Sequence, residues 1–147
     1  MFASVTRVRV RSVRYLPAFV WQIFLSQRQV MRAPGFCGGR LLADAGRTFW
    51  TLTVWESDQA MKAFRGSAAH AKVMPRLAEW CDEAANAHWT ASADTVPLWP
   101  EAHKHLTEEG RLSPVAHPSP GHEARAFPKP RVTLFTAMDL KPAGASK

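Results

Sequence analysis

The stretch Arg-Thr-Phe-Trp-Thr-Leu-Thr-Val-Trp, residues 47–55, is the clearest strand signal in the sequence. β-Branched and aromatic side chains alternate along it with a period of two, which is typical of a strand with two distinct faces. Aromatic and hydroxyl side chains share one face, which consists of Phe49, Thr51, Thr53 and Trp55. The other face holds Trp50, Leu52 and Val54. Both faces therefore need to be covered by other parts of a fold.

Three segments upstream of this strand have periodicities of their own. Residues 2–13 alternate, which predicts a half-buried strand with an arginine ladder on one face, made of Arg7, Arg9 and Arg11. Residues 16–32 carry apolar side chains at helical spacing, and Pro34 ends that predicted helix. Residues 36–43 predict a second strand, which leads to the turn before residue 47.

The residues downstream predict two helices and a final strand. Ser57 is a good N-cap for a short helix that Gly66 breaks, and a second helix is expected over 67–84. Residues 86–93 alternate again and predict the last strand. The order β-α-β-β-α-β predicts an α+β, ferredoxin-like antiparallel sheet with both helices on one face.

The face of the sheet away from the helices is expected to carry Phe49 and Trp55. A bare sheet with these side chains would expose a large apolar patch. A second copy of the chain, the C-terminal extension or RNA would have to cover it. We expect a homodimer, because twin sheets packed face to face would hide both patches at once.

The composition changes after residue 96, so we divide the chain into a domain over 1–96 and an extension over 97–147. The extension predicts a short helix over 100–110 and a proline-rich arm over 111–130. Residues 131–140 alternate once more and predict an added strand.

The composition is that of a folded globular protein, with 46% hydrophobic and 21% charged residues in 147. The formal net charge of +7 favours an anionic partner. The two cysteines, Cys37 and Cys81, lie far apart without metal-ligand spacing and are expected to be reduced thiols. No apolar run approaches the roughly 20 residues that span a bilayer, so we expect a cytoplasmic protein without a membrane partner.

Three stretches, in order, resemble the antibiotic-biosynthesis-monooxygenase superfamily of dimeric α/β barrels. They are residues 34–42 at the helix-to-strand junction, 49–57 at the third strand, and 64–70 at the helix break. The likeness covers about residues 1–95. Within the superfamily, the sequence resembles spheroidene monooxygenase and uncharacterised relatives, and the Ser113–Pro120 stretch is similar to the tail of the uncharacterised group.

The resemblance implies a homodimer with a ligand cavity beside each sheet. Members include oxygenases, haem-degrading enzymes, isomerases and proteins without known activity, so the fold does not decide whether this chain is an enzyme. The haem-degrading branch has a Trp before the helix-break Ser and a His seven residues after it. Phe64 and Met74 occupy those places, and His70 lies at a different helical phase. The cofactor is therefore left open between none and haem.

Two histidines and two arginines are the candidates for chemistry. His70, beside the helix break, could act as a general base or haem ligand, and a histidine has the pKa for such work near neutrality. Arg7 could stabilise a developing oxyanion, with Arg9 binding an anionic group beside it. The alternative for these arginines is a solvated stripe that pairs with acidic residues. His88, on the last strand, is a candidate for ligand binding.

The remaining candidates for ligand binding share the mixed face of the third strand: Phe49, Thr51, Thr53 and Trp55. A mostly apolar surface with a few placed polar groups is typical of small-molecule sites, and dimer packing is the alternative. No metal site is predicted, because the tail histidines follow no ligand spacing; they are His103, His105, His117 and His122.

Three functions remain open from the sequence. The first is a monooxygenase-like enzyme that acts on a small apolar or acidic molecule. The second is a ligand-binding or structural dimer without catalysis. The third is an RNA-binding module, which the same element order can build. Nucleic acid is the less favoured partner, because Thr51 stands where that module needs a stacking aromatic.

Overall fold

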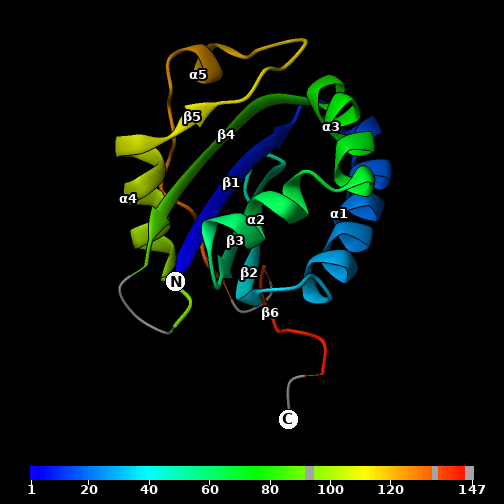
Figure 1. Ribbon diagram of the computed structural model, residues 1–147. Coiled ribbons are helices and arrows are strands. Elements are labelled where there is room, and N and C mark those ends of the chain that lie inside the picture. The colour runs from blue at the N-terminus through cyan, green and yellow to red at the C-terminus, as the bar shows by residue number, and fades with distance from the viewer. Residues whose placement is uncertain (92–94, 134–135, 145–147) are drawn as a thin grey trace.

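The computed structural model describes residues 1–91, 95–133 and 136–144, with only the backbone described at 68 and 69. Six strands and their connecting helices occur in the described residues (Figure 1). The strands are β1 (Phe2–Val10), β2 (Phe36–Asp44), β3 (Thr48–Trp55), β4 (Cys81–Thr90), β5 (Arg111–Leu112) and β6 (Ala137–Leu140). The helices are a 3-10 turn (Val13–Tyr15), α1 (Leu16–Met31), α2 (Asp58–Arg65), α3 (Ala68–Trp80), α4 (Trp99–Glu109) and α5 (Pro120–Glu123).

The sheet is antiparallel throughout, with the strand order β5-β4-β1-β3-β2-β6. Its central four strands, β4-β1-β3-β2, form the ferredoxin-like sheet that the sequence predicts. The α+β fold class is therefore confirmed. The short strands β5 and β6 come from the C-terminal extension and add one strand to each edge.

The sheet has a helix layer on each side (Figure 1). Helices α1, α2 and α3 lie on one face, and α4 lies on the opposite face beside β4. Trp99, Ala102 and Leu106 of α4 are buried against Trp50 and Leu52 and their neighbours in one continuous core. Burial of this apolar surface on both faces stabilises the sheet between the two layers.

The two faces of the sheet are the reverse of those that the sequence predicts. Phe49 and Trp55 face the helix layer of α1–α3, not the side away from it. The opposite face carries Trp50 and Leu52, and the chain's own α4 covers it. Alternation groups the residues that share a face, but it does not say which face receives which helices.

This arrangement bears on two earlier expectations. The homodimer stays a prediction, and the face that would pair in a barrel is covered by α4. The RNA-binding alternative needs an open sheet face, and the same helix occupies it. The aromatic face of β3 therefore supports neither the homodimer nor the RNA-binding module, because helices α1–α3 lie over it.

Several boundaries differ from the predicted ones. The helix expected over 67–84 ends at Trp80, and β4 begins at Cys81, because every second side chain of 81–89 is buried in the sheet. Pairing with β1 thus overrides the helix propensity of this alanine-rich segment. The predicted last strand, 86–93, extends into 92–93, which lie outside the described residues.

The C-terminal extension contains more structure than expected. Its predicted helix is α4, but the proline-rich arm also contributes β5 and α5. Of the strand predicted over 131–140, only Ala137–Leu140 is a strand, and residues 134–135 lie outside the described part.

The junction between α1 and β2 explains the Pro34-Gly35 pair. Gly35 has a φ of +82°, which favours glycine, and a Cβ there would lie 2.6 Å from the Cβ of Ala60. At the next junction, Ser57 caps α2 as predicted, since its Oγ accepts a hydrogen bond from the Ala60 amide at 3.1 Å. The absence of a side chain at Gly35 thus lets α2 approach the start of β2.

Candidate functional site

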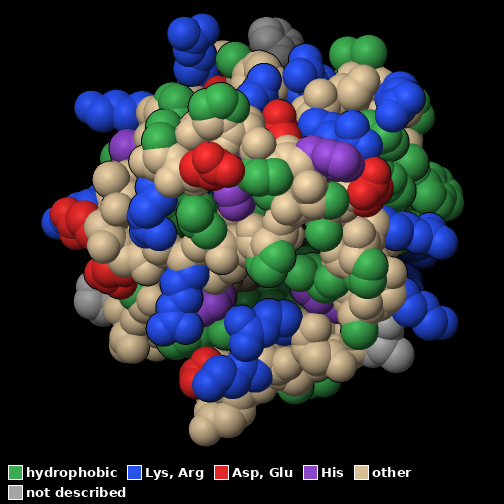
Figure 2. Space-filling view, turned by 90° about the horizontal axis from the view of Figure 1, so that it is seen from above, with side chains coloured by type: hydrophobic (Ala, Val, Ile, Leu, Met, Phe, Trp, Pro, Cys, Tyr) green, Lys and Arg blue, Asp and Glu red, His purple; other side chains and the backbone are tan. Residues whose placement is uncertain are grey.

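A cavity of about 260 Å³ lies between the sheet and helices α1, α2 and α3. Its floor consists of alternate side chains of β1, β3 and β4, and its roof comes from α1 and α3. On the upper face of the molecule, Figure 2 shows a hollow with hydrophobic side chains in its depth and histidine beside it. The mixed aromatic and hydroxyl face of β3 therefore faces enclosed space.

Polar side chains form a belt across this floor. Strand register places them in two adjacent rows, His88–Ser4–Thr53 and Asn86–Thr6–Thr51. Asn86 donates to the Ser113 hydroxyl at 3.1 Å, and Trp55 donates to the Thr53 hydroxyl at 3.0 Å. Within the described residues, the hydroxyls of Thr6 and Thr51 have no protein hydrogen-bond partner, so they are free to bind a ligand.

Apolar side chains surround the belt. Phe49 packs against Phe19 of α1 with ring centroids 4.9 Å apart, and Trp55 packs against Phe64 of α2 at 5.4 Å. The roof adds further apolar side chains, which are Ile23, Val30, Val73 and Leu77. An apolar enclosure with a few fixed polar groups is the usual construction of a small-molecule site.

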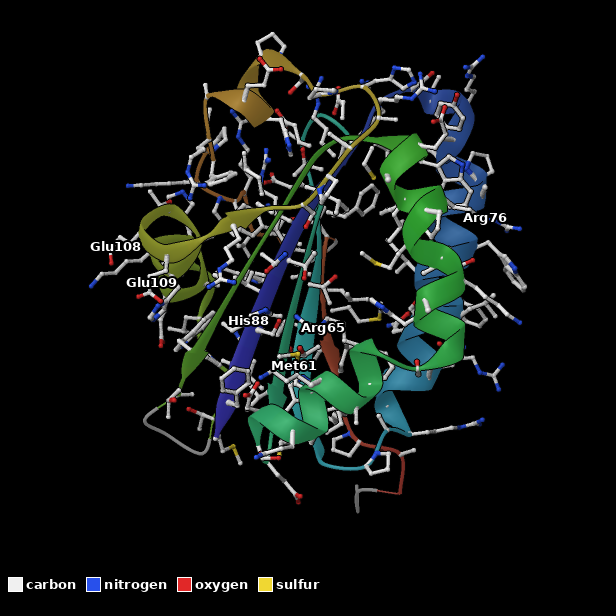
Figure 3. The ribbon with its side chains drawn as sticks, turned by 45° about the horizontal axis from the view of Figure 1, so that its top comes forward. Met61, Arg65, Arg76, His88, Glu108 and Glu109 are labelled. Carbon is white, nitrogen blue, oxygen red and sulfur yellow. The ribbon has the colours of Figure 1, made fainter. Side chains whose placement is uncertain are left out.

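His88 lies at one end of the belt (Figure 3). Its Nδ1 is 3.0 Å from the Ser4 Oγ, and its Nε2 is 3.5 Å from Nη1 of Arg65. Burial lowers the pKa of His88, and the positive charge of Arg65 lowers it further. The imidazole is therefore neutral near pH 7.

His70 lines the same cavity from the first turns of α3. Its ring lies 5.7 Å from that of Phe64, and its Nδ1 is buried without a hydrogen-bond partner in the described part of the chain. Burial lowers the pKa of His70, a hydrogen bond to the backbone of Arg65 opposes this shift, and the positive charge of Arg65 adds to it. A neutral imidazole with a free nitrogen can accept a proton from a bound molecule.

The arginine ladder does not belong to this cavity, which corrects the expectation for Arg7 and Arg9. Arg7 is buried on the opposite face, where its Nη1 lies 3.0 Å from the Glu83 carboxylate. Arg9 lies 3.5 Å from Asp82. The odd-numbered side chains of β1 point to the α4 side, so both arginines are neutralised by acidic residues of β4.

Six of the eight candidate residues thus line one cavity: Phe49, Thr51, Thr53, Trp55, His70 and His88. The polar lining residues that sequence reasoning missed include Ser4, Thr6, Arg65 and Asn86. The alternation of β1 does place Thr6 opposite the arginines, and that of β4 places Asn86 with His88. Arg65 carries no such signal, because only the packing of α2 brings it to the sheet.

The lining residues and the volume of the cavity suit neither a metal ion nor haem. Within the described ranges, no group of three His, Cys, Asp or Glu side chains could hold a metal ion. The cavity of about 260 Å³ is smaller than the roughly 300–1,000 Å³ of sites for drug-sized ligands, and haem is larger than most of these. Haem therefore does not fit the space between α1, α3 and the sheet.

The fold and the cavity together define a ferredoxin-like α+β domain with a C-terminal extension over the second face of its sheet. The family model described as domain of unknown function DUF3291 matches residues 4–126. The chain belongs to this family. The match runs from β1 to the arm, so it includes α4 as well as the ferredoxin-like part.

Solved structures of low sequence identity share the fold. A Nitrosomonas europaea protein assigned as an antibiotic biosynthesis monooxygenase is 17% identical, with a TM-score of 0.57 over 63% of this chain and 100% of its own. Rv0793 from Mycobacterium tuberculosis is 14% identical, with a TM-score of 0.57 over 63% and 97%. SnoaB, a cofactor-independent oxygenase from Streptomyces nogalater, is 20% identical, with a TM-score of 0.53 over 66% and 97%.

These similarities establish the fold and not the reaction. None of the curated proteins matches the chain. No helix in the described ranges is long and apolar enough to cross a membrane.

Proposed function

We propose that this protein is a monooxygenase-type enzyme that binds a small, apolar, electron-rich molecule in the cavity between the sheet and helices α1–α3. The observation that carries the proposal is the combination of the apolar enclosure with His70, whose buried Nδ1 has no partner in the described residues. A buried nitrogen without a partner is costly unless a ligand can use it.

The chemistry that suits this arrangement begins with a proton transfer. The neutral imidazole of His70 accepts a proton from an acidic C–H or O–H of the substrate, and the hydroxyls of Thr6 and Thr51 hold the resulting oxyanion. The electron-rich anion then reacts with O₂. In the net reaction a CH₂ group and O₂ give a C=O group and H₂O, so the substrate supplies the electrons.

Two further observations support this reaction class. The lining of the cavity is largely apolar, and hydrogen bonds to a developing anion are stronger in such surroundings than in water. Among the proteins with this fold, SnoaB is described as a cofactor-independent oxygenase. The likeness to SnoaB concerns the fold.

Oxygen uptake by chelator-treated protein tests the proposal directly. A panel of anthrones, naphthols and hydroquinones should contain substrates that consume O₂ in the presence of the protein. His70→Gln should then lower kcat by about 10²- to 10⁴-fold, the usual contribution of a general base. His117→Gln, an exposed change on the arm, is the matched control and should leave kcat unchanged.

Binding measured on the same panel separates the alternatives. Ligands that bind without oxygen uptake would favour a binding protein without catalysis. A panel that neither binds nor reacts would overturn the proposed function.

A further inference from the structure

One end of the cavity carries positive charge that no acidic side chain neutralises in the described part of the chain. Arg65 is the last residue of α2, and its Nη1 lies 3.5 Å from Nε2 of His88. Arg65 and His88 point toward one another, from α2 and from the sheet (Figure 3). Arg111 of β5 adds a second cation whose charge reaches His88.

The acidic groups that could neutralise this end are engaged elsewhere. Asp58, also on α2, forms an ion pair with Lys62 at 2.8 Å. Within the described residues, neither Arg65 nor Arg111 has a carboxylate within 4.0 Å, although six other Arg and Lys–acid contacts occur. The groups that act on His88 are therefore three cations and one carboxylate that is already paired.

The hydrogen-bond geometry at His88 suits an anion. In the free protein Nε2 accepts from Arg65, because a guanidinium only donates, and the ring proton on Nδ1 faces the Ser4 hydroxyl at 3.0 Å. When an anion takes the place of this contact, the Ser4 hydroxyl can donate to Nδ1 instead, and Nε2–H then joins the guanidinium N–H groups of Arg65 as a donor. Two convergent donors, one of them charged, are the usual partners of a carboxylate.

The same face of α2 also supplies apolar contact. Met61 lies one turn before Arg65, is 4% exposed and packs with Trp55 and Val30. A ligand with an acidic group at Arg65 would therefore have its apolar body over the polar belt and beneath the apolar roof.

We propose that the molecule bound in this cavity carries a carboxylate, which Arg65 and His88 hold at the end of the polar belt. This inference rests on the proposed function and narrows its substrate class to apolar acids. Arg65 sets the specificity, and His70 remains the residue for proton transfer.

A matched pair of ligands tests the inference by isothermal titration calorimetry. 2-Naphthoate carries the carboxylate, and 2-naphthamide is its neutral counterpart of nearly the same shape. The wild-type protein should bind 2-naphthoate at least about tenfold more tightly than the amide, which is the lower end of the range for a hydrogen bond to a charged group.

Arg65→Gln should remove this preference while the affinity for 2-naphthamide stays the same. Arg76→Gln is the matched control, because Arg76 lies on the outer side of α3 and does not line the cavity (Figure 3). It removes the same charge from the protein and should leave the preference unchanged. Equal losses in the two variants would mean a general effect of net charge and would overturn the inference.

The pKa of His88 provides a second measurement, which would not change if Arg65 and His88 only stabilised the fold. A carboxylate beside Nε2 should raise the pKa of His88 in NMR titrations with 2-naphthoate, and 2-naphthamide should not. Equal affinity for the two ligands, with no change at His88, would reject the carboxylate and leave the proposed function intact. Failure of both ligands to bind would instead contradict the cavity as a site for aromatic molecules.

Discussion

Arg7 of β1 and Glu83 of β4 form a buried ion pair, 3.0 Å long, on the face of the sheet opposite the cavity. The guanidinium also lies 5.8 Å from the ring centroids of Trp50 and Phe127, and the other carboxylate oxygen accepts a hydrogen bond from Ser119 at 2.9 Å. The pair therefore joins two central strands to the C-terminal arm. Its role in this fold is to fix the arm on the sheet.

Glu83→Ala should lower the free energy of unfolding by about 3–5 kcal/mol, because it leaves the buried Arg7 without a counter-charge. Urea denaturation at pH 7 measures the change. Glu79→Ala removes the exposed partner of Arg11, whose ion pair is also 3.0 Å long, and should cost less than about 1 kcal/mol. Similar costs in the two variants would show that burial of the Arg7–Glu83 pair is not what makes it important.

Leu106→Ala should destabilise the protein by about 2–5 kcal/mol, because Leu106 of α4 is fully buried against the sheet. Glu108→Ala, on the outer side of the same helix, serves as the control and should change stability by less than about 0.5 kcal/mol (Figure 3). Thermal unfolding of both variants tests whether α4 covers this face in solution. If Leu106→Ala left the stability unchanged, another surface would have to cover this face of the sheet.

The stability of the protein should fall as the pH falls from 7 to 5, in part because of His70 and His88. Burial lowers the pKa of both side chains in the folded protein. The unfolded chain, with histidine pKa values of about 6.5, then binds more protons, so stability is present above that pH and is lost as the pH falls through the folded pKa. His88→Gln should flatten this dependence in urea denaturation across the range. Parallel curves for wild type and variant would contradict the expected contribution of His88.

Thr51→Val should weaken the binding of a ligand with a hydroxyl group without changing the size of the cavity. The lost hydrogen bond is worth about 0.5–1.5 kcal/mol, which is roughly a two- to tenfold change in Kd. Calorimetry with 2-naphthol and 2-methylnaphthalene separates the hydroxyl from the apolar body, and only 2-naphthol should lose affinity. Thr107→Val on α4 is the control outside the cavity, and a loss for both ligands would point to a distorted site instead.

The sequence alone predicted the parts of the fold that follow from local periodicity. The alternation of residues 47–55 grouped Phe49, Thr51, Thr53 and Trp55, and these four do share the cavity. The helical spacing before Pro34 predicted α1, and the Ser57 cap predicted the start of α2. Each of these signals is read within a few residues of chain, so no distant partner is needed to interpret it.

The tertiary structure decided which layer each face meets. Alternation separated Arg7 from Thr6 on one strand and Trp50 from Thr51 on another. Only packing showed that α4 covers the face of Arg7 and Trp50 and that the cavity lies on the other. The meeting of His70, His88 and Arg65 likewise depends on how α2 and α3 dock on the sheet. A side-chain pattern records whether a surface is apolar and not what it packs against, because hydrophobic burial has no preferred direction or partner.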